Sequence, residues 1–201
     1  MNRTRLHWAL IAATAAGIGV GAALASREIT DWIDTTLPDA RGIASFNRPG
    51  TITLLSTTGE VIQKLGPATR DKLKRGEMPQ LVQQAFIAAE DRRFFRHDGV
   101  DGWGIARAVI TNVRQGSVRE GASTITQQLA RTVFLSQDRT ITRKLKEAAL
   151  ALKLERQLSK QQILEQYLNY VYLGSSAYGI ADAAWVYFSK TPDELTVGEA
   201  A

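Results

Sequence analysis

The sequence predicts a mainly α-helical domain that follows an amino-terminal membrane helix and a short β-hairpin. Apolar residues recur at helical spacing over much of the chain after residue 79, and two capping boxes, at Ser159 and Thr196, mark helix starts. An uncharged stretch, Leu6–Ser26, has the length of a bilayer-spanning helix. We expect three parts: 1–26 as cytoplasmic tip and anchor, 27–75 as a linker with the hairpin, and 76–201 as the helical domain.

The uncharged stretch has two interpretations. Its 21 residues lie between Arg5 and Arg27, and a helix of that length spans roughly 31 Å. The length favours an uncleaved anchor, whereas Ala23-Leu24-Ala25 has the small-x-small form of a signal-peptidase site and would make the segment a cleaved signal peptide. In both cases the remaining chain is exported and the basic amino terminus stays inside.

The later elements follow from turn and capping signals. Residues 27–50 contain helix-breaking proline and glycine, and two β-prone runs, 51–55 and 60–64, flank a Ser-Thr-Thr-Gly turn. Helices are expected from Pro79 to Glu90 with Leu81, Ala85, Ala88 and Ala89 on the apolar face, over 105–114, after Ser123, over 140–158, from Ser159 to about Tyr172, and through Trp185 to a point before Pro192. Only two residues follow the last capping box, so we expect a longer protein.

Composition excludes several kinds of site. The chain has 201 residues, no cysteine and two histidines far apart in sequence, so a disulfide scaffold, a thiolate site and an ordinary zinc site are not expected. The net charge is +5, and residues 139–160 alone hold seven basic and two acidic side chains, 7 − 2 = +5. Such an excess suits an anionic ligand or lipid surface, although a solvated helix face is the default explanation.

Three segments combine residues that could carry chemistry. In the first, Glu90–Gly99, an acidic pair closes an apolar helix, and a carboxylate desolvated there would be a useful base. The alternative is a solvated helix end whose last carbonyls are capped by His97. In the second, Gly121–Arg131, small and hydroxyl residues begin a helix that carries paired amides and a cation; it suits an anion, or is a capped core helix.

The third segment, Arg139–Glu147, places basic side chains and a carboxylate on one helix face. Glu147 lies four residues after Arg143 and three after Lys144, which is the spacing of helical neighbours. The segment is either an ordinary surface ion pair or a row of cations that binds phosphate.

Together these segments resemble the motifs of glycosyltransferase family 51, the peptidoglycan glycosyltransferases. The resemblance covers roughly residues 79–201 and includes E-D-R-R-F-F-R-H-D-G, G-A-S-T-I-T-Q-Q-L-A-R, R-K-L-K-E, L-S-K-Q-Q-I-L-E-Q-Y-L-N and Y-L-G-S-S-A-Y-G-I-A-D-A-A in the family's order. The wording around Y-L-N-Y-V-Y-L-G is closer to the bifunctional class A penicillin-binding proteins than to the single-domain transferases. The sequence is therefore similar to the amino-terminal part of such a protein.

The resemblance implies a lysozyme-like helical lobe with a small, mobile, membrane-facing lobe. It implies an inverting transferase that polymerises lipid II into β-1,4 glycan strands and releases undecaprenyl pyrophosphate. Glu90 matches the general base, and Glu147 the second acidic residue, which orients the donor, holds a divalent cation or braces Arg143. The positions that match substrate-binding residues are Asp91, Phe94, His97, Thr124, Gln128, Arg131, Arg139 and Lys144. Where the family has Lys-Asn, this chain has Arg131-Thr132, which keeps the charge and leaves the asparagine's contact in question.

The resemblance also sets expectations for cofactors, partners and location. No cofactor is required, and magnesium or manganese near the pyrophosphate stays an open alternative. The expected partners are lipid II, the growing glycan strand, the membrane and other cell-wall synthesis proteins, without nucleic acid. We expect a single-pass protein of the bacterial inner membrane with its catalytic domain outside. Two other functions stay open: glycan cleavage by a lytic transglycosylase or lysozyme-like enzyme, and a non-catalytic membrane-tethered scaffold.

Overall fold

The computed structural model describes residues 28, 30–39, 42–43, 52–66, 70, 72–115, 123–135 and 140–201. The chain divides into two compact units, 1–39 and 40–201, and residues 30–36 of the first are helical. The expected anchor, residues 6–26, and the expected phosphate-binding Arg139 lie outside the described residues. Over the described ranges, no helix combines the length and the apolar character that crossing a bilayer requires.

The expected hairpin is confirmed. Strand β1 (Ile52–Leu55) pairs antiparallel with β2 (Val61–Leu65), and a register irregularity falls between Leu54 and Leu55. The connecting turn is closed by the Ser56 N–H, which donates to the Glu60 carbonyl at 2.8 Å. Nearly all side chains of both strands are exposed.

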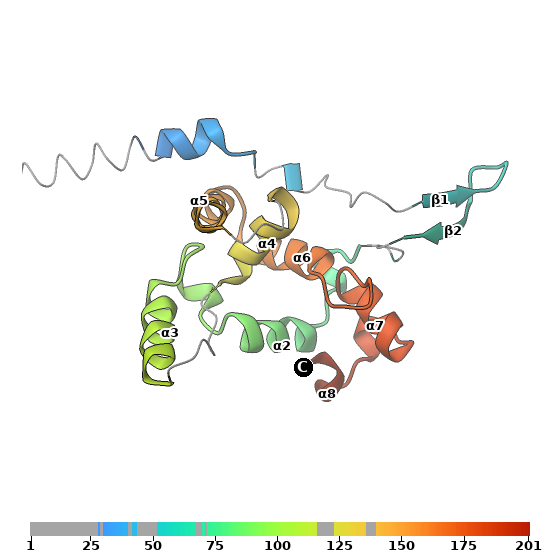
Figure 1. Cartoon of the computed structure of the whole chain (residues 1–201). Helices are drawn as coiled ribbons and strands as arrows, with labels where there is room; N and C mark the ends of the chain where they lie inside the picture. Colours follow the sequence, from blue (N-terminus) through green and yellow to red (C-terminus); the bar gives the residue numbers. More distant parts are fainter. Residues whose placement is uncertain are drawn as a thin grey trace, which may run out of the picture. The chain divides into compact units, whose positions relative to one another are not determined.

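The rest of the second unit is helical, as predicted (Figure 1). Its elements are η2 (Arg75–Glu77), α2 (Gln80–Glu90), η3 (Phe94–Arg96), α3 (Gly102–Gln115), α4 (Ile125–Phe134), α5 (Ile141–Gln157), α6 (Lys160–Tyr170), α7 (Ile180–Phe188), η4 (Pro192–Glu194) and α8 (Val197–Ala200). The capping boxes at Ser159 and Thr196 are both formed, with the N3 side chain returning to the N-cap backbone. Helix α3 begins three residues before its expected start at residue 105.

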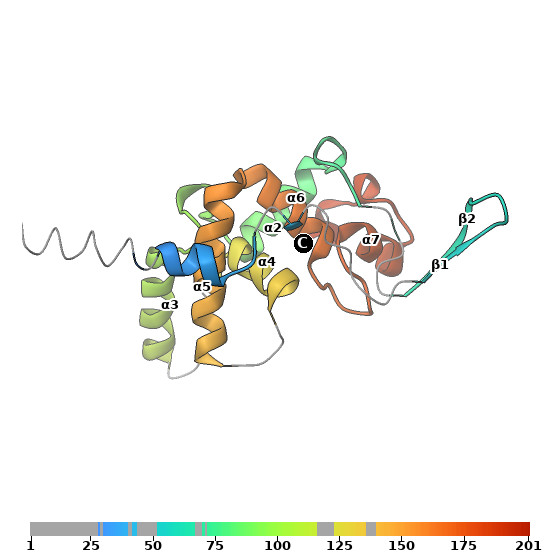
Figure 2. The same cartoon turned by 90° about the horizontal axis from the view of Figure 1, so that it is seen from above.

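Helix α4 lies in the centre of the core, packed against both α5 and α6. Its N-cap is Thr124, whose hydroxyl accepts from the Gln127 N–H while the Gln127 side chain accepts from the Thr124 N–H. Fully buried apolar side chains fill the space between the three helices: Ile125, Leu129 and Ala130 from α4, Leu150, Ala151 and Leu154 from α5, and Ile163, Leu164 and Leu168 from α6. Helices α5 and α6 are joined by a two-residue connection (Figure 2).

The expected apolar face of α2 is wrong at its carboxyl end. Val82 is the buried residue of this helix, Leu81 and Ala85 are half-buried, and Ala88 and Ala89 are exposed. Helix α2 contacts α8. Alanine carries too little apolar surface to fix the buried face of a helix by itself, so the larger Val82 decides the orientation.

The turn after α2 approaches α5 closely at Gly99. This residue has φ +95°, and a Cβ added to it would lie 2.8 Å from both the carbonyl carbon and the oxygen of Ala151. Gly59, in the hairpin turn, has φ +86° and open space around it. The two glycines therefore share a backbone conformation that disfavours side chains, and only Gly99 also has a steric reason to lack one.

We expect Gly99→Ala to destabilise the fold well beyond Gly59→Ala. Both variants place alanine at positive φ, which costs about 1–2 kcal/mol, and Gly99→Ala must in addition displace the backbone of α5. Thermal or urea unfolding of both variants measures the difference. Equal losses of stability would contradict the close packing of this turn on α5.

Candidate active site

Glu90 is the last residue of α2, and its side chain is exposed. The expected desolvation of this carboxylate is therefore wrong. Its Oε2 instead accepts a hydrogen bond from Gln128 Nε2 at 2.8 Å, and Gln128 Oε1 accepts from the Tyr167 hydroxyl at 3.2 Å. An accessible carboxylate with a fixed hydrogen-bond partner can both meet a substrate and hold a defined orientation.

The buried carboxylate of the first segment belongs to Asp91. It is 7% exposed, and it accepts from His97 Nε2 at 2.9 Å and from the Ile125 N–H, at the start of α4, at 3.1 Å. The Gly99 N–H donates to His97 Nδ1, which leaves Nε2 as the ring nitrogen that donates to Asp91. Asp91 thus joins the end of α2 to the positive end of α4, and His97 does not cap the carbonyls of α2 as the alternative interpretation held.

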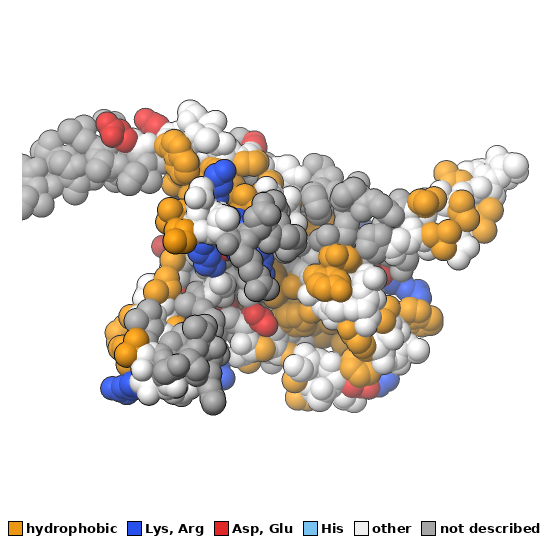
Figure 3. Space-filling model, in the orientation of Figure 1, with side chains coloured by type: hydrophobic (Ala, Val, Ile, Leu, Met, Phe, Trp, Pro, Cys, Tyr) orange, Lys and Arg blue, Asp and Glu red, His pale blue; other side chains and the backbone are white. Residues whose placement is uncertain are grey.

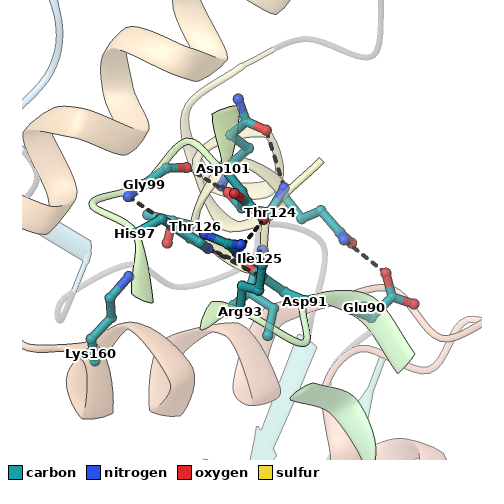
Figure 4. A network of polar contacts seen from close by, with 12 residues as sticks. Glu90, Asp91, Arg93, His97, Gly99, Asp101, Thr124, Ile125, Thr126 and Lys160 are labelled. Carbon is teal, nitrogen blue, oxygen red and sulfur yellow. Dashed lines mark hydrogen bonds and ion pairs between the residues drawn. The ribbon is translucent and has the colours of Figure 1, made fainter. Parts of the chain in front are cut away.

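Phe94 and Thr124 are also buried, at 0% and 2% exposure. The Thr124 hydroxyl donates to the Gly99 carbonyl at 2.6 Å, and Lys160 Nζ lies 4.5 Å from the centre of the Phe94 ring. Figure 4 shows Asp91, His97, Gly99 and Thr124 within one polar network, with Glu90 at its edge. The side chains of Asp91, Phe94, His97 and Thr124 are enclosed by protein and support the site from within, and their expected part in substrate binding stays a prediction.

Sequence analysis missed an ionic group beneath this network. Glu155 Oε1 accepts from the Thr126 hydroxyl at 2.6 Å and from Lys160 Nζ at 2.7 Å. The group connects α4, α5 and the start of α6 below Phe94. No sequence spacing indicates the contact, because the two partners of Glu155 lie on different helices.

Glu147 is the second acidic residue of the site, and it is only 1% exposed. Both neighbours on its own helix reach it: Arg143 pairs with Oε1, and Lys144 Nζ lies 2.9 Å from Oε2. Lys144 Nζ also donates to the Ser123 hydroxyl at 2.8 Å. The predicted helical spacing is confirmed, and the interpretation as an ordinary surface ion pair is wrong because the carboxylate is buried.

Arg143 and Lys144 contact this carboxylate, and the charge of Arg131 acts on Lys144. We call Arg131, Arg143 and Lys144 the cationic cluster. Burial lowers the pKa of the Lys144 amine, and the charges of Arg131 and Arg143 lower it further. The Lys144 side chain nevertheless keeps 45% of its surface exposed. Mutual repulsion among these half-buried cations favours an anion that would neutralise them.

The charge of Arg131 is felt in both parts of the site. Its charge acts on Lys144 in the cluster and on Tyr167, which also senses the charge of Glu90. Thr132, at the position where the family has asparagine, donates its hydroxyl to the Gln128 carbonyl in its own helix at 2.9 Å. Helix α4 thus carries the partner of Glu90 on one turn and a cation of the cluster on the next.

The described residues do not include a group of three or more histidine or acidic side chains arranged to hold a metal ion. Both oxygens of Glu147 already face cations of its own helix. The structure thus favours the bracing role for Glu147 among the three that sequence analysis left open.

The chain is similar to known proteins over most of its length. The family described as Transglycosylase matches residues 58–201. Penicillin-binding protein 1A of Neisseria gonorrhoeae is 49% identical over 165 residues, which cover 82% of this chain and 21% of the relative. Penicillin-binding protein 1A of Escherichia coli K12 is 45% identical over 170 residues, which cover 85% of this chain and 20% of the relative. The chain thus spans about a fifth of the length of these relatives.

Proposed function

Because the chain belongs to the transglycosylase family of peptidoglycan glycosyltransferases, we propose that it is the glycosyltransferase domain of a class A penicillin-binding protein and polymerises lipid II. The observation that carries the proposal is that a base and a group of cations lie on neighbouring helices. An exposed carboxylate, Glu90, is fixed by an amide of α4, and a cationic cluster lies along α4 and α5. A transferase with a pyrophosphate leaving group needs both.

In the proposed reaction Glu90 accepts the proton of the acceptor sugar's 4-hydroxyl. The acceptor oxygen forms a bond to the donor's anomeric carbon as the bond from that carbon to the pyrophosphate oxygen breaks. Attack from the face opposite the leaving group inverts the anomeric centre, as in inverting glycosidases with a sugar hydroxyl in place of water. The exposure of Glu90 leaves room for a sugar beside it.

The leaving undecaprenyl pyrophosphate gains negative charge and needs cations more than a proton donor. Lys144 and Arg131 present positive charge, and buried Glu147 holds Arg143 and Lys144 in place. Arg139 would add a further charge. The proposed mechanism does not depend on a divalent cation, since the cationic cluster can neutralise the leaving oxygens by itself.

We propose further that the domain works at the outer surface of the bacterial inner membrane, held there by residues 6–26. The exposed apolar side chains of α3 support a membrane-facing lobe: Trp103 is 66% exposed, Ile110 51% and Val113 77% (Figure 3). Sequencing the amino terminus of the protein isolated from cells distinguishes an uncleaved anchor from a cleaved signal peptide. Met1 at the amino terminus favours the anchor, and Ser26 would establish cleavage instead.

Two incubations test the proposed activity against its alternatives. With lipid II, the intact protein should form long glycan strands; with finished glycan, it should release no fragments. Release of fragments without polymerisation would favour a glycan-cleaving enzyme. Binding to anionic lipid without either reaction would favour a scaffold.

A further inference from the structure

We propose that Tyr167 is a positioning residue that orients the base Glu90 through the side-chain amide of Gln128. The inference rests on the proposed function, because it assigns Glu90 the role of base. Tyr167 lies on α6, Gln128 on α4 and Glu90 at the end of α2, so three helices meet in one chain of hydrogen bonds.

The direction of this chain follows from the chemistry of its ends. An ionised carboxylate only accepts hydrogen bonds, so the group of Gln128 that lies 2.8 Å from Glu90 Oε2 must be its NH₂. The amide oxygen then faces Tyr167, whose hydroxyl lies 3.2 Å away and must donate. One donor on α6 therefore determines which way the amide points, and a flipped amide would set its oxygen against the carboxylate.

Burial makes Tyr167 a rigid starting point. The residue is 1% exposed, and its ring meets Phe86 edge-on with the ring centres 6.1 Å apart. Gln128 is half-buried and Glu90 is exposed. An exposed glutamate at a helix end would otherwise sample many rotamers. The hydrogen-bond chain restricts Glu90 because it links this side chain to a buried one.

The hydroxyl remains a donor over the whole working range of pH. Burial raises the pKa of Tyr167, the charge of Glu90 raises it further and Asp91 adds to the effect, while Arg131 opposes it. These are the charged groups that bear on the hydroxyl. Because the phenol stays protonated, Tyr167 remains a donor to Gln128 as the pH changes.

The test compares Tyr167→Phe with Tyr170→Phe in the intact protein, with lipid II as substrate. Tyr170 lies on the same helix, is 3% exposed and has its hydroxyl 2.5 Å from Lys72 Nζ, away from Glu90. Each variant loses one buried hydroxyl, so each loses similar stability. We expect Tyr167→Phe alone to lower kcat roughly 10- to 100-fold with little change in KM.

A pair of variants gives a second readout. In a Gln128→Met background, Tyr167→Phe should have little further effect, because the amide through which it acts is gone.

Each outcome decides a separate question. A kcat like that of the unchanged protein in Tyr167→Phe would overturn the inference, as would equal losses in both tyrosine variants. If Tyr167→Phe does not fold, Gln128→Met carries the same expectation for kcat, and an unchanged kcat there would overturn the inference. Failure of the unchanged protein to polymerise lipid II would overturn the proposed function instead.

Discussion

Glu90→Gln is expected to abolish glycan polymerisation while the domain stays folded. The change removes the proton acceptor and almost no volume, and loss of a general base slows a reaction by about 10²–10⁴-fold. Glu90 is exposed and ends its helix, so its charge contributes little to the core. Strand length on lipid II and the melting temperature, measured on the same preparation, separate lost chemistry from lost structure.

Asp98→Asn is the matched control for this substitution. Asp98 is an exposed carboxylate eight positions further along the same segment, and it lies outside the hydrogen-bond chain that fixes Glu90. It should retain the unchanged turnover. Appreciable synthesis of long strands by Glu90→Gln would refute the assignment of the base, and equal loss in both variants would point to a general effect of charge.

Local signals in the sequence predicted the helical elements well. Capping boxes depend on residues three apart, so the starts of α6 and α8 could be read directly from Ser159 and Thr196. The helical spacing of Arg143 and Lys144 to Glu147 likewise fixed a contact within one helix. Such contacts need no knowledge of the tertiary structure.

Contacts between helices could not be predicted in the same way. Periodicity identifies an apolar face but not what packs on it, so Tyr167 reads as an ordinary core residue of α6 although its hydroxyl reaches Gln128. The same limit hid Asn169, whose amide forms two hydrogen bonds of 2.9 Å with the backbone of Leu73. The same limit hid which carboxylate of the acidic pair is buried. Glu90 is exposed and Asp91 is buried, because the position of α4 decides which of the two it covers.

The buried position of Glu147 separates two effects within the cationic cluster. Removing its charge with Glu147→Gln leaves Arg143 and Lys144 beside a neutral amide, so this variant should lose stability. Lys144→Met differs, because Arg143 remains paired with the buried carboxylate. It should therefore lose less stability than Glu147→Gln.

Lys144→Met should therefore lose turnover, with a smaller fall in melting temperature than Glu147→Gln. Methionine keeps a helix former and the apolar stem, and a lost cation at the leaving oxygen should raise the barrier by roughly 2–4 kcal/mol, as for one lost electrostatic donor. The loss should fall on kcat more than on KM if the charge acts mainly in the transition state. Unchanged turnover would place the pyrophosphate site elsewhere.

The pH dependence of the unchanged protein gives an independent check on Lys144. Only the protonated amine can stabilise the leaving group, so turnover should fall as pH rises through the lowered pKa of Lys144, below the ordinary lysine range. Lys144→Arg keeps its charge at every accessible pH, so that alkaline loss should disappear while part of the turnover remains. An alkaline limb that is identical in Lys144→Arg and in the unchanged protein would show that another group titrates. The cationic cluster would then brace Glu147 without acting on the leaving pyrophosphate.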